Sequence, residues 1–296
     1  MAPTHDTRRL ALTEEALTIL FCLIDDAYTL LNPRAKSYES IKHLSDSEVI
    51  ALALLQQLRG IESERSFLRD AERFVSHLFP GVVGLHPSSF HRRVRKLRRF
   101  LEPMRRDVVA ELVGDPETLI IDSTLLAVLH SRQVAQSAGF PGAEWVRWGS
   151  FAVYGAKLHL ICSTNRGPIS YELTAANVAE VKLTEELLDG ADLLLGGEVA
   201  RRLLGDLAYR SGALEDALAQ TGILLVTERS RQHGERQQVE IAFASLKREL
   251  RLGETLARTL TGLATRIAAK ITAFTYGFLV NRMLDRPQGR IKERWA

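Results

Sequence analysis

Apolar residues recur at helical spacing toward both ends of the chain and at strand spacing between them. The first part, to about residue 115, has the pattern of successive helices. Short apolar runs and alternating segments then extend, with helical stretches between them, to about residue 235, and long helices follow as far as Leu284. Strands that are followed by alternating helices and strands are typical of a mixed sheet flanked by helices. The pattern therefore predicts an α/β protein with helical regions before and after the sheet.

Local signals mark the ends of the helices in the first part. Thr13 can cap a helix that starts at the next residue, and Ser45 forms a capping-box pattern with Glu48 before a long apolar run. Gly60 is a suitable end for that helix, because glycine readily adopts the left-handed conformation that follows many helix C-termini. A further helix is expected over residues 64–78.

A strongly basic helix is expected after the turn region 80–87, with Ser88 or Ser89 as its cap. Valine and leucine recur at helical spacing over residues 91–101, so the cations cover the other faces. Several short helices that end in a basic one suit a helix-turn-helix-like DNA-binding domain, although a basic face exposed only to solvent gives the same pattern. The candidate DNA contacts are Arg92, Arg93, Arg95, Lys96, Arg98 and Arg99.

Two of the strand-like runs in the middle of the chain end on a carboxylate, Asp122 and Asp206. A carboxylate at the end of a buried strand can project from the sheet edge, where side chains from several strands can hold a metal ion. An aspartate in that position also commonly caps a turn or the next helix, so these two residues alone leave both interpretations open. The expected strands are 118–122, 151–162, 168–173, 203–206 and 223–226, with helices over 178–188 and 212–219.

A third carboxylate lies on a predicted helix over residues 236–247. At about 100° per residue, His233, Arg236, Glu240 and Lys247 share one face if the helix begins that early. The adjoining apolar stripe can pack on the sheet, which places Glu240 at the edge of the buried face. One helix can then supply a metal ligand and two phosphate-contacting cations; the alternative is a solvated face of ion pairs.

Charge is distributed unevenly along the chain. The 39 basic and 36 acidic residues give a net charge of +3, which neither requires nor excludes a nucleic-acid partner. Residues 1–115 carry 17 basic and 16 acidic residues (+1), residues 116–227 carry 8 and 13 (−5), and residues 228–296 carry 14 and 7 (+7). An acidic middle followed by a basic end is expected of a metal-holding site beside an anionic polymer, although such asymmetry also arises by chance.

Composition excludes several classes of protein. Hydrophobic residues make up 46% of the chain and charged residues 25%, values that are typical of a globular protein and exclude global disorder. Cys22 and Cys162 match neither a disulfide framework nor a zinc motif. No segment has the length and apolarity of a membrane span, and the N-terminus is unlike a secretory signal. These features predict a cytoplasmic protein with no membrane partner.

Taken together, these segments resemble the DDE transposases of bacterial insertion sequences. The resemblance covers roughly residues 118–250, and the matching segments follow the order of that family. They are Ile120-Ile121-Asp122-Ser123, Tyr154 to Ile161, Leu173-Thr174-Ala175-Ala176-Asn177, Leu204-Gly205-Asp206-Leu207-Ala208-Tyr209, and Glu240 to Lys247.

The resemblance implies a catalytic domain similar to ribonuclease H and retroviral integrases. It implies that Asp122, Asp206 and Glu240 are both the catalytic residues and the metal ligands, with two Mg²⁺ or Mn²⁺ ions per active site. We assign Asp122 as the ligand shared by both ions, with Asp206 and Glu240 each completing one. The implied partners are the terminal repeats of a mobile element, target DNA and a second copy of the chain in a homodimer, in a nucleoid-associated bacterial protein.

The cations around Glu240 also fit the family. Many relatives have a tyrosine, an arginine, the glutamate and a lysine in that order, and Arg236, Glu240 and Lys247 keep the family's spacing. His233 stands where those relatives have tyrosine, which puts the role of the tyrosine in doubt without affecting the metal site. Arg236 and Lys247 are expected to hold the DNA backbone, and Lys157 is a weaker candidate for the same task.

We therefore expect a helical DNA-binding domain over residues 1–115, a ribonuclease H-like catalytic domain over 116–255, and a C-terminal helix and basic tail over 256–296 that pack on the catalytic domain. The apolar segment 271–280 can close the core or form a dimer interface. Two other functions remain open: a nuclease of the same fold that cuts without joining ends, and a catalytically inactive DNA-binding protein. Catalysis by two metal ions requires the three carboxylates to converge.

Overall fold

The computed structural model describes residues 5–33, 42–113, 117–129, 140, 142–148, 150–195, 201–227, 234–254, 256–291 and 295. Contacts divide the chain into two units. The helical unit comprises Met1–Val108, Arg248–Leu256 and Thr265–Ala296, and the sheet unit comprises Val109–Lys247 and Ala257–Ala264. This division differs from the expected domains in that it groups residues 265–296 with the N-terminal helices.

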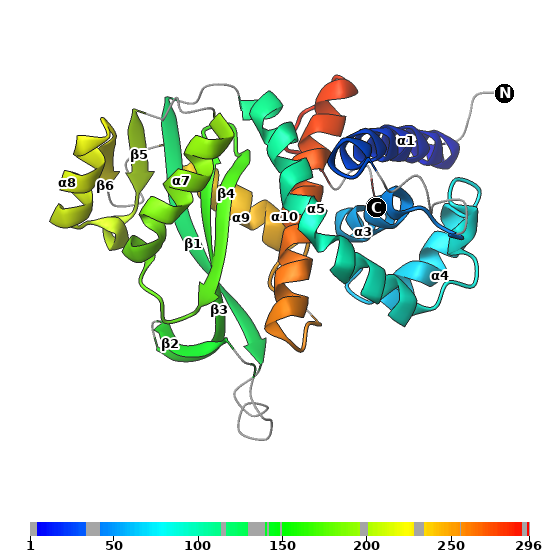
Figure 1. The fold of residues 1–296 in the computed structure, drawn as a ribbon, viewed down its shortest axis with the longest axis horizontal. Helices are drawn as coiled ribbons and strands as arrows, with labels where there is room; N and C mark the ends of the chain where they lie inside the picture. The colour runs from blue at the N-terminus through cyan, green and yellow to red at the C-terminus, as the bar shows by residue number, and fades with distance from the viewer. Residues whose placement is uncertain are drawn as a thin grey trace. The chain divides into compact units, whose positions relative to one another are not determined.

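Long helices dominate the helical unit (Figure 1). The Ser45 capping box is confirmed, since the Ser45 hydroxyl accepts from the Glu48 N–H at 3.0 Å. Gly60 follows the end of α3 at φ +63°, as expected. The elements are α1 (His5–Leu31), α3 (Asp46–Leu58), α4 (Glu64–Phe74), the short 3-10 helix η1 (Pro80–Val82), α5 (Pro87–Val113) and α10 (Leu260–Met283).

Two expected helix starts are wrong. Helix α1 begins at His5, so Thr13 lies inside the helix and does not cap it. Helix α5 begins at Pro87, and the His86 side chain accepts from the Ser88 N–H at 3.3 Å, so neither Ser88 nor Ser89 is the cap. Proline is well suited to a first helical position because it has no N–H to leave unpaired there.

Helix α10 is a core element of the helical unit. Residues 271–280 are all buried, so the alternative that this segment forms the core is confirmed. A Cβ added at Gly277 would lie 3.2 Å from Ile291 and 3.4 Å from Leu58, which shows how closely the neighbouring segments approach. The helix also carries buried charge: Lys270 is fully buried and its ammonium donates to Glu62, as does Arg266.

In the described residues of the sheet unit there is one mixed sheet of six strands, in the order β2-β3-β1-β5-β6 with β4 also paired to β3. Strands β1, β3 and β4 form an antiparallel meander, whereas β5 and β6 run parallel to β1 on its other side. The strands are β1 (Thr118–Leu129), β2 (Glu144–Trp148), β3 (Phe151–Ser163), β4 (Pro168–Ala175), β5 (Arg202–Gly205) and β6 (Leu224–Thr227).

Helices cover both faces of this sheet. In the view of Figure 1, α7 (Thr184–Leu195) lies in front of the strands and α9 (Gln237–Glu249) passes behind them. Leu119 and Ile121 of β1 pack on the α7 side with Leu203 of β5 in a fully buried core. The remaining elements are η2 (Glu180–Leu183), η3 (Leu207–Tyr209) and α8 (Gly212–Gln220).

The sequence pattern predicted the strands of this sheet correctly, with two exceptions. Strand β1 continues seven residues beyond the expected end at Asp122, and β2 was not expected at all. Strand β2 pairs with the first residues of β3, 151–155, and β4 pairs with the rest, from Ala156 onward. At the junction, a Cβ on Gly155 would lie 2.1 Å from the Leu126 carbonyl oxygen, so only glycine allows β3 to approach β1 there.

Candidate active site

Strand register brings the two aspartates to the same level of the sheet. The parallel pairing of β1 with β5 ends at Ile120 opposite Leu204, and Asp122 and Asp206 each follow two residues later. Because side chains alternate along strands, Asp122 lies on the same face as Ile120, opposite to the face of Ile121. Asp122 is therefore not the end of its strand. It lies where the parallel partner ends and the antiparallel partner β3 continues, with Asp122 opposite Leu160.

Helix α9 adds the third carboxylate. Burial and, to a smaller extent, the charges of Asp206 and Glu240 raise the pKa of Asp122 to about 6, while the Ser123 N–H and Arg236 act in the opposite direction. A carboxyl group responds in this way only when the other charges lie near it. Asp122, Asp206 and Glu240, which come from β1, the end of β5 and α9, are thus brought into one electrostatic site.

The three carboxylates do not form a closed cluster. Among the residues that the structure describes, no group of three Asp, Glu, His or Cys side chains is arranged to hold a metal ion. Each carboxylate makes a local hydrogen bond: Asp122 accepts from the Ser123 N–H and Asp206 from the Ala208 N–H, both at 2.8 Å. Glu240 accepts from Arg236 at 2.7 Å, so one guanidinium provides positive charge beside the carboxylates.

The cations of α9 differ in how accessible they are. Helix α9 begins at Gln237, so Arg236 precedes it, and His233 lies outside the described residues. The Arg236 side chain is only 8% exposed and pairs with Glu240, which is 46% exposed. Lys247 is exposed as a whole, but partial burial of its ammonium lowers its pKa, while the nearby Asp122 acts in the opposite direction. Of the two cations that the sequence singled out here, Arg236 and Lys247, it is therefore Lys247 that is accessible to a DNA backbone.

Lys157 is not available to DNA in the way expected from the sequence. It is 6% exposed, and its ammonium donates to Glu180 at 3.0 Å and to the Val178 carbonyl at 2.9 Å. Glu180 also accepts from the Ser123 hydroxyl at 3.1 Å. Burial would raise the pKa of Glu180, but the hydrogen bond and charge of Lys157 hold it below its ordinary value.

Sequence patterns missed two residues beside these carboxylates, Glu180 and Tyr209. Tyr209 is fully buried, and burial raises the pKa of its hydroxyl, as do the charges of Asp122, Glu180 and Asp206. A Cβ on Gly205 would lie 3.0 Å from the Tyr209 ring, so the glycine before Asp206 makes room for it. The segment 204–209 was a signal for Tyr209, whereas nothing in the sequence pattern singles out Glu180.

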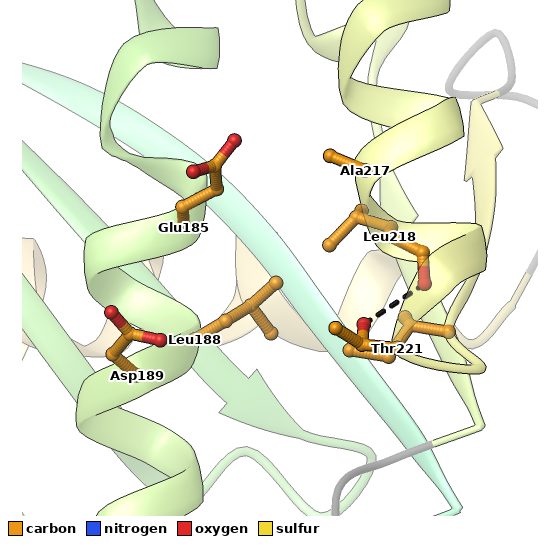
Figure 2. A pocket seen from close by; sticks show the side chains of 7 residues that line it. Glu185, Leu188, Asp189, Ala217, Leu218 and Thr221 are labelled. Carbon is orange, nitrogen blue, oxygen red and sulfur yellow. Dashed lines mark hydrogen bonds between the residues drawn. The ribbon is translucent and has the colours of Figure 1, made fainter.

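A separate cavity of about 230 Å³ lies between α7 and α8 (Figure 2). Glu185 and Asp189 of α7 line it on one side, and Ala217 and Leu218 of α8 line it on the other, with Thr221 directly after α8. Its lining includes none of the three candidate catalytic carboxylates, so this cavity is not the catalytic site.

In the helical unit, most cations of α5 face solvent. Five of the six candidate DNA contacts are exposed, and Arg93 is the exception because it pairs with Asp46 at 2.6 Å. The connection between α4 and α5 spans residues 75–86, which is longer than the three or four residues of a helix-turn-helix. A DNA-binding role for α5 therefore depends on its charge. The exposed residues are Arg92, Arg95, Lys96, Arg98 and Arg99.

Comparison with known proteins identifies the family. The family model of the transposase DDE domain matches residues 113–276, which is more than half of the chain. This chain is a DDE transposase. The match covers Asp122, Asp206 and Glu240. The sheet of the transposase is ribonuclease H-like, as the resemblance implied, in the order and direction of its strands β1, β3, β4, β5 and β6.

Two further comparisons add little to this assignment. Among solved structures, the transposase is similar to a crystal structure of a pre-cleavage Mos1 transpososome, with 12% sequence identity and a TM-score of 0.26 over 81% of this chain and 79% of that one. No curated protein matches the chain. Within the described residues, no helix of the transposase is long and apolar enough to cross a membrane.

Proposed function

We propose that this transposase cleaves DNA strands at the ends of a mobile element and joins them to target DNA, using divalent metal ions held by Asp122, Asp206 and Glu240. The observation that carries this proposal is that the charges of Asp206 and Glu240 both act on the largely buried carboxylate of Asp122. A buried carboxylate whose pKa is raised by two like charges is a site that a cation stabilises.

The donor set fits Mg²⁺ or Mn²⁺. Both ions prefer hard oxygen ligands and retain several waters, so three carboxylates together with substrate phosphate make a suitable shell. Two such ions would supply Lewis acidity toward the phosphate oxygens and activate the attacking oxygen. The charges of both Asp206 and Glu240 act on Asp122, so Asp122 is the residue that we propose would contribute to both ions.

Arg236 and Lys247 have different roles in this proposal. Arg236 balances the carboxylates before metal is bound, because its guanidinium already pairs with Glu240 and lowers the pKa of Asp122. Lys247 is exposed and lies near enough to Asp122 for the charge of that carboxylate to act on it, so Lys247 can contact a phosphate of the strand that enters the site. We place Lys157 outside the set of DNA contacts, because its ammonium is buried against Glu180.

The deciding experiment uses the full chain and DNA carrying the ends of the element from which the chain is encoded, with a 3′-hydroxyl exposed in one substrate. With Mg²⁺ we expect cleaved strands and joined products. Cleaved strands without joined products would assign a nuclease of the same fold. DNA binding without either product, in Mg²⁺ and in Mn²⁺, would assign a catalytically inactive DNA-binding protein. We further propose that two copies of the chain pair two ends, which sedimentation of the DNA complex would test.

The basic face of α5 gives a prediction about affinity. Replacing Arg95 and Arg99 by alanine removes two exposed cations one turn apart, and we expect weaker binding to any DNA sequence. If both contact phosphates, the slope of log K against log salt concentration falls in magnitude by about 2, at ~0.9 per contact. The measurement is a fluorescence-anisotropy titration at several salt concentrations.

The matched control replaces Lys182 and Arg201, two exposed cations of the sheet unit, by alanine. This variant loses the same formal charge, so a general charge effect would weaken binding equally in both variants. An unchanged salt slope in the α5 variant would show that this helix does not contact the DNA backbone.

A further inference from the structure

Strand β1 is held on one side only at the catalytic Asp122. The pairing with β5 ends at Ile120, so at Asp122 and Ser123 the remaining strand partner is β3, with Leu160 and His159 opposite. A metal ligand at such a position requires another support, since ligands must be fixed in position to bind a metal tightly.

The support lies on the other face of the sheet. Side chains alternate along β1, so the Ser123 side chain points away from the Asp122 carboxylate, toward the face of Ile121. There the Ser123 hydroxyl donates to Glu180 at 3.1 Å, and Lys157 donates to the same Glu180 oxygen at 3.0 Å. Lys157 also donates to the Val178 carbonyl at 2.9 Å. One buried ammonium thus connects β3 with the segment after β4, and Glu180 connects that segment with β1.

Ser123 transmits this connection to the metal ligand. Its backbone N–H donates to the Asp122 carboxylate at 2.8 Å, so the position of the Ser123 peptide sets the direction of that hydrogen bond. Tyr209 of η3 lies beside this network, because its buried hydroxyl is close enough for the Ser123 side chain to lower its pKa. Fixing the Ser123 side chain through Glu180 and Lys157 therefore fixes the Asp122 carboxylate.

We propose that Ser123, Glu180 and Lys157 form a positioning network that orients Asp122 for divalent-metal binding from the opposite face of the sheet. The proposal rests on the proposed function of Asp122 as a metal ligand. It assigns Lys157 a role different from the DNA contact expected from the sequence, because its ammonium is buried and already donates to Glu180 and to the Val178 carbonyl.

Ser123→Ala is the most direct test, since it removes the hydroxyl that joins Glu180 to β1 and leaves the Lys157–Glu180 pair in place. We expect Mn²⁺ affinity, measured by calorimetry on the DNA-free protein, to fall about 10- to 100-fold, the range for partners that orient metal ligands. The Mg²⁺ concentration for half-maximal cleavage should rise by a similar factor. Ser123→Thr keeps the hydroxyl and should bind Mn²⁺ close to the wild-type level.

Lys157→Met distinguishes positioning from DNA contact. We expect weaker Mn²⁺ binding with unchanged DNA affinity and unchanged salt dependence of binding. The double variant Lys157→Met/Glu180→Gln should recover part of the Mn²⁺ affinity of Lys157→Met, because it no longer leaves a buried carboxylate without its cation. Lys182→Met is the matched control, as it removes an exposed lysine from the same segment.

The outcomes separate this proposal from the proposed function. Unchanged Mn²⁺ affinity in folded Ser123→Ala and Lys157→Met would overturn the network, and so would a Lys157→Met variant that loses DNA affinity but keeps its Mn²⁺ affinity. If Asp122→Asn itself retains wild-type cleavage, the assignment of Asp122 fails and the network fails with it. If Asp122→Asn is inactive and the network variants bind Mn²⁺ normally, only the network is wrong.

Discussion

Asp122→Asn should abolish DNA cleavage and, in the absence of divalent metal, make the protein more stable at neutral pH. The loss of activity follows because Asp122 is the carboxylate that the other two converge on. Removing such a ligand forfeits several kcal/mol of transition-state stabilisation, so cleavage should fall by about 10³-fold or more. DNA affinity should change little, because the predicted DNA contacts lie on α5 and at Lys247.

The gain in stability follows from the pKa of Asp122. The pKa rises from 3.8 to about 6 in the folded protein, so the folded state binds a proton more tightly than the unfolded state. Protonation therefore stabilises the fold fully below about pH 4, and this contribution is lost as the pH rises to about 6. At 1.36 kcal/mol per pH unit, the ionised carboxyl costs about 2–3 kcal/mol at pH 7, and asparagine removes this cost.

Urea unfolding of both proteins at pH 5 and pH 7.5, without divalent metal, measures this effect. The difference between variant and wild type should grow with pH, and Mg²⁺ should stabilise the wild type more than the variant. Asp216→Asn, at an exposed position of α8, is the matched control and should show neither effect. Normal cleavage by Asp122→Asn in Mg²⁺ would refute the assignment of this residue.

The fold could be predicted from the sequence wherever a local pattern decides the structure. The Ser45 capping box, the hairpin before Pro168 and the short apolar runs at 118 and 203 each carry their signal within a few residues, and all are present. Strand β2 escaped prediction because its five residues, Glu144–Trp148, include two charges and pair only with the first residues of β3. The end of β1 was misplaced because the apolar run stops close to the end of the β5 pairing, whereas β3 pairs with β1 as far as Leu129.

At the candidate active site, too, only the residues that a local pattern marks could be predicted from the sequence. The aspartates after two apolar runs and the glutamate on an amphipathic helix were visible because each lies at a characteristic place within its own element. Lys157 was misjudged, since a lysine in an alternating strand gives no sign of whether its partner is solvent, DNA or a buried carboxylate. Its partner Glu180 lies 23 residues away on a short 3-10 helix, and only the folded chain brings the two together.

In the helical unit, we expect Glu62→Ala to lower the free energy of unfolding by about 3–5 kcal/mol, the cost of breaking a buried ion pair by removing one partner. Glu62 accepts from Lys270 and from Arg266, and Lys270 is fully buried. After the substitution Arg266 keeps Glu64, at 2.6 Å, whereas Lys270 keeps only the Leu250 carbonyl among the partners the structure describes. Urea unfolding at pH 7 measures the loss.

The pH dependence distinguishes an unpaired buried charge from a simple loss of packing. Burial lowers the pKa of Lys270, and Glu62 opposes this shift, so removing Glu62 lowers the pKa further. An ammonium with a lowered pKa in the folded state destabilises the fold until it loses its proton. The deficit of Glu62→Ala should therefore shrink as the pH rises from neutral toward 10, whereas a packing defect would not depend on pH.

Lys270→Met/Glu62→Gln provides the control for this mechanism. It removes both charges and keeps the volumes of the side chains, so it should be more stable than Glu62→Ala although it carries two substitutions. A double variant as unstable as Glu62→Ala, with a deficit that does not change with pH, would show that the ion pair is not what stabilises this core.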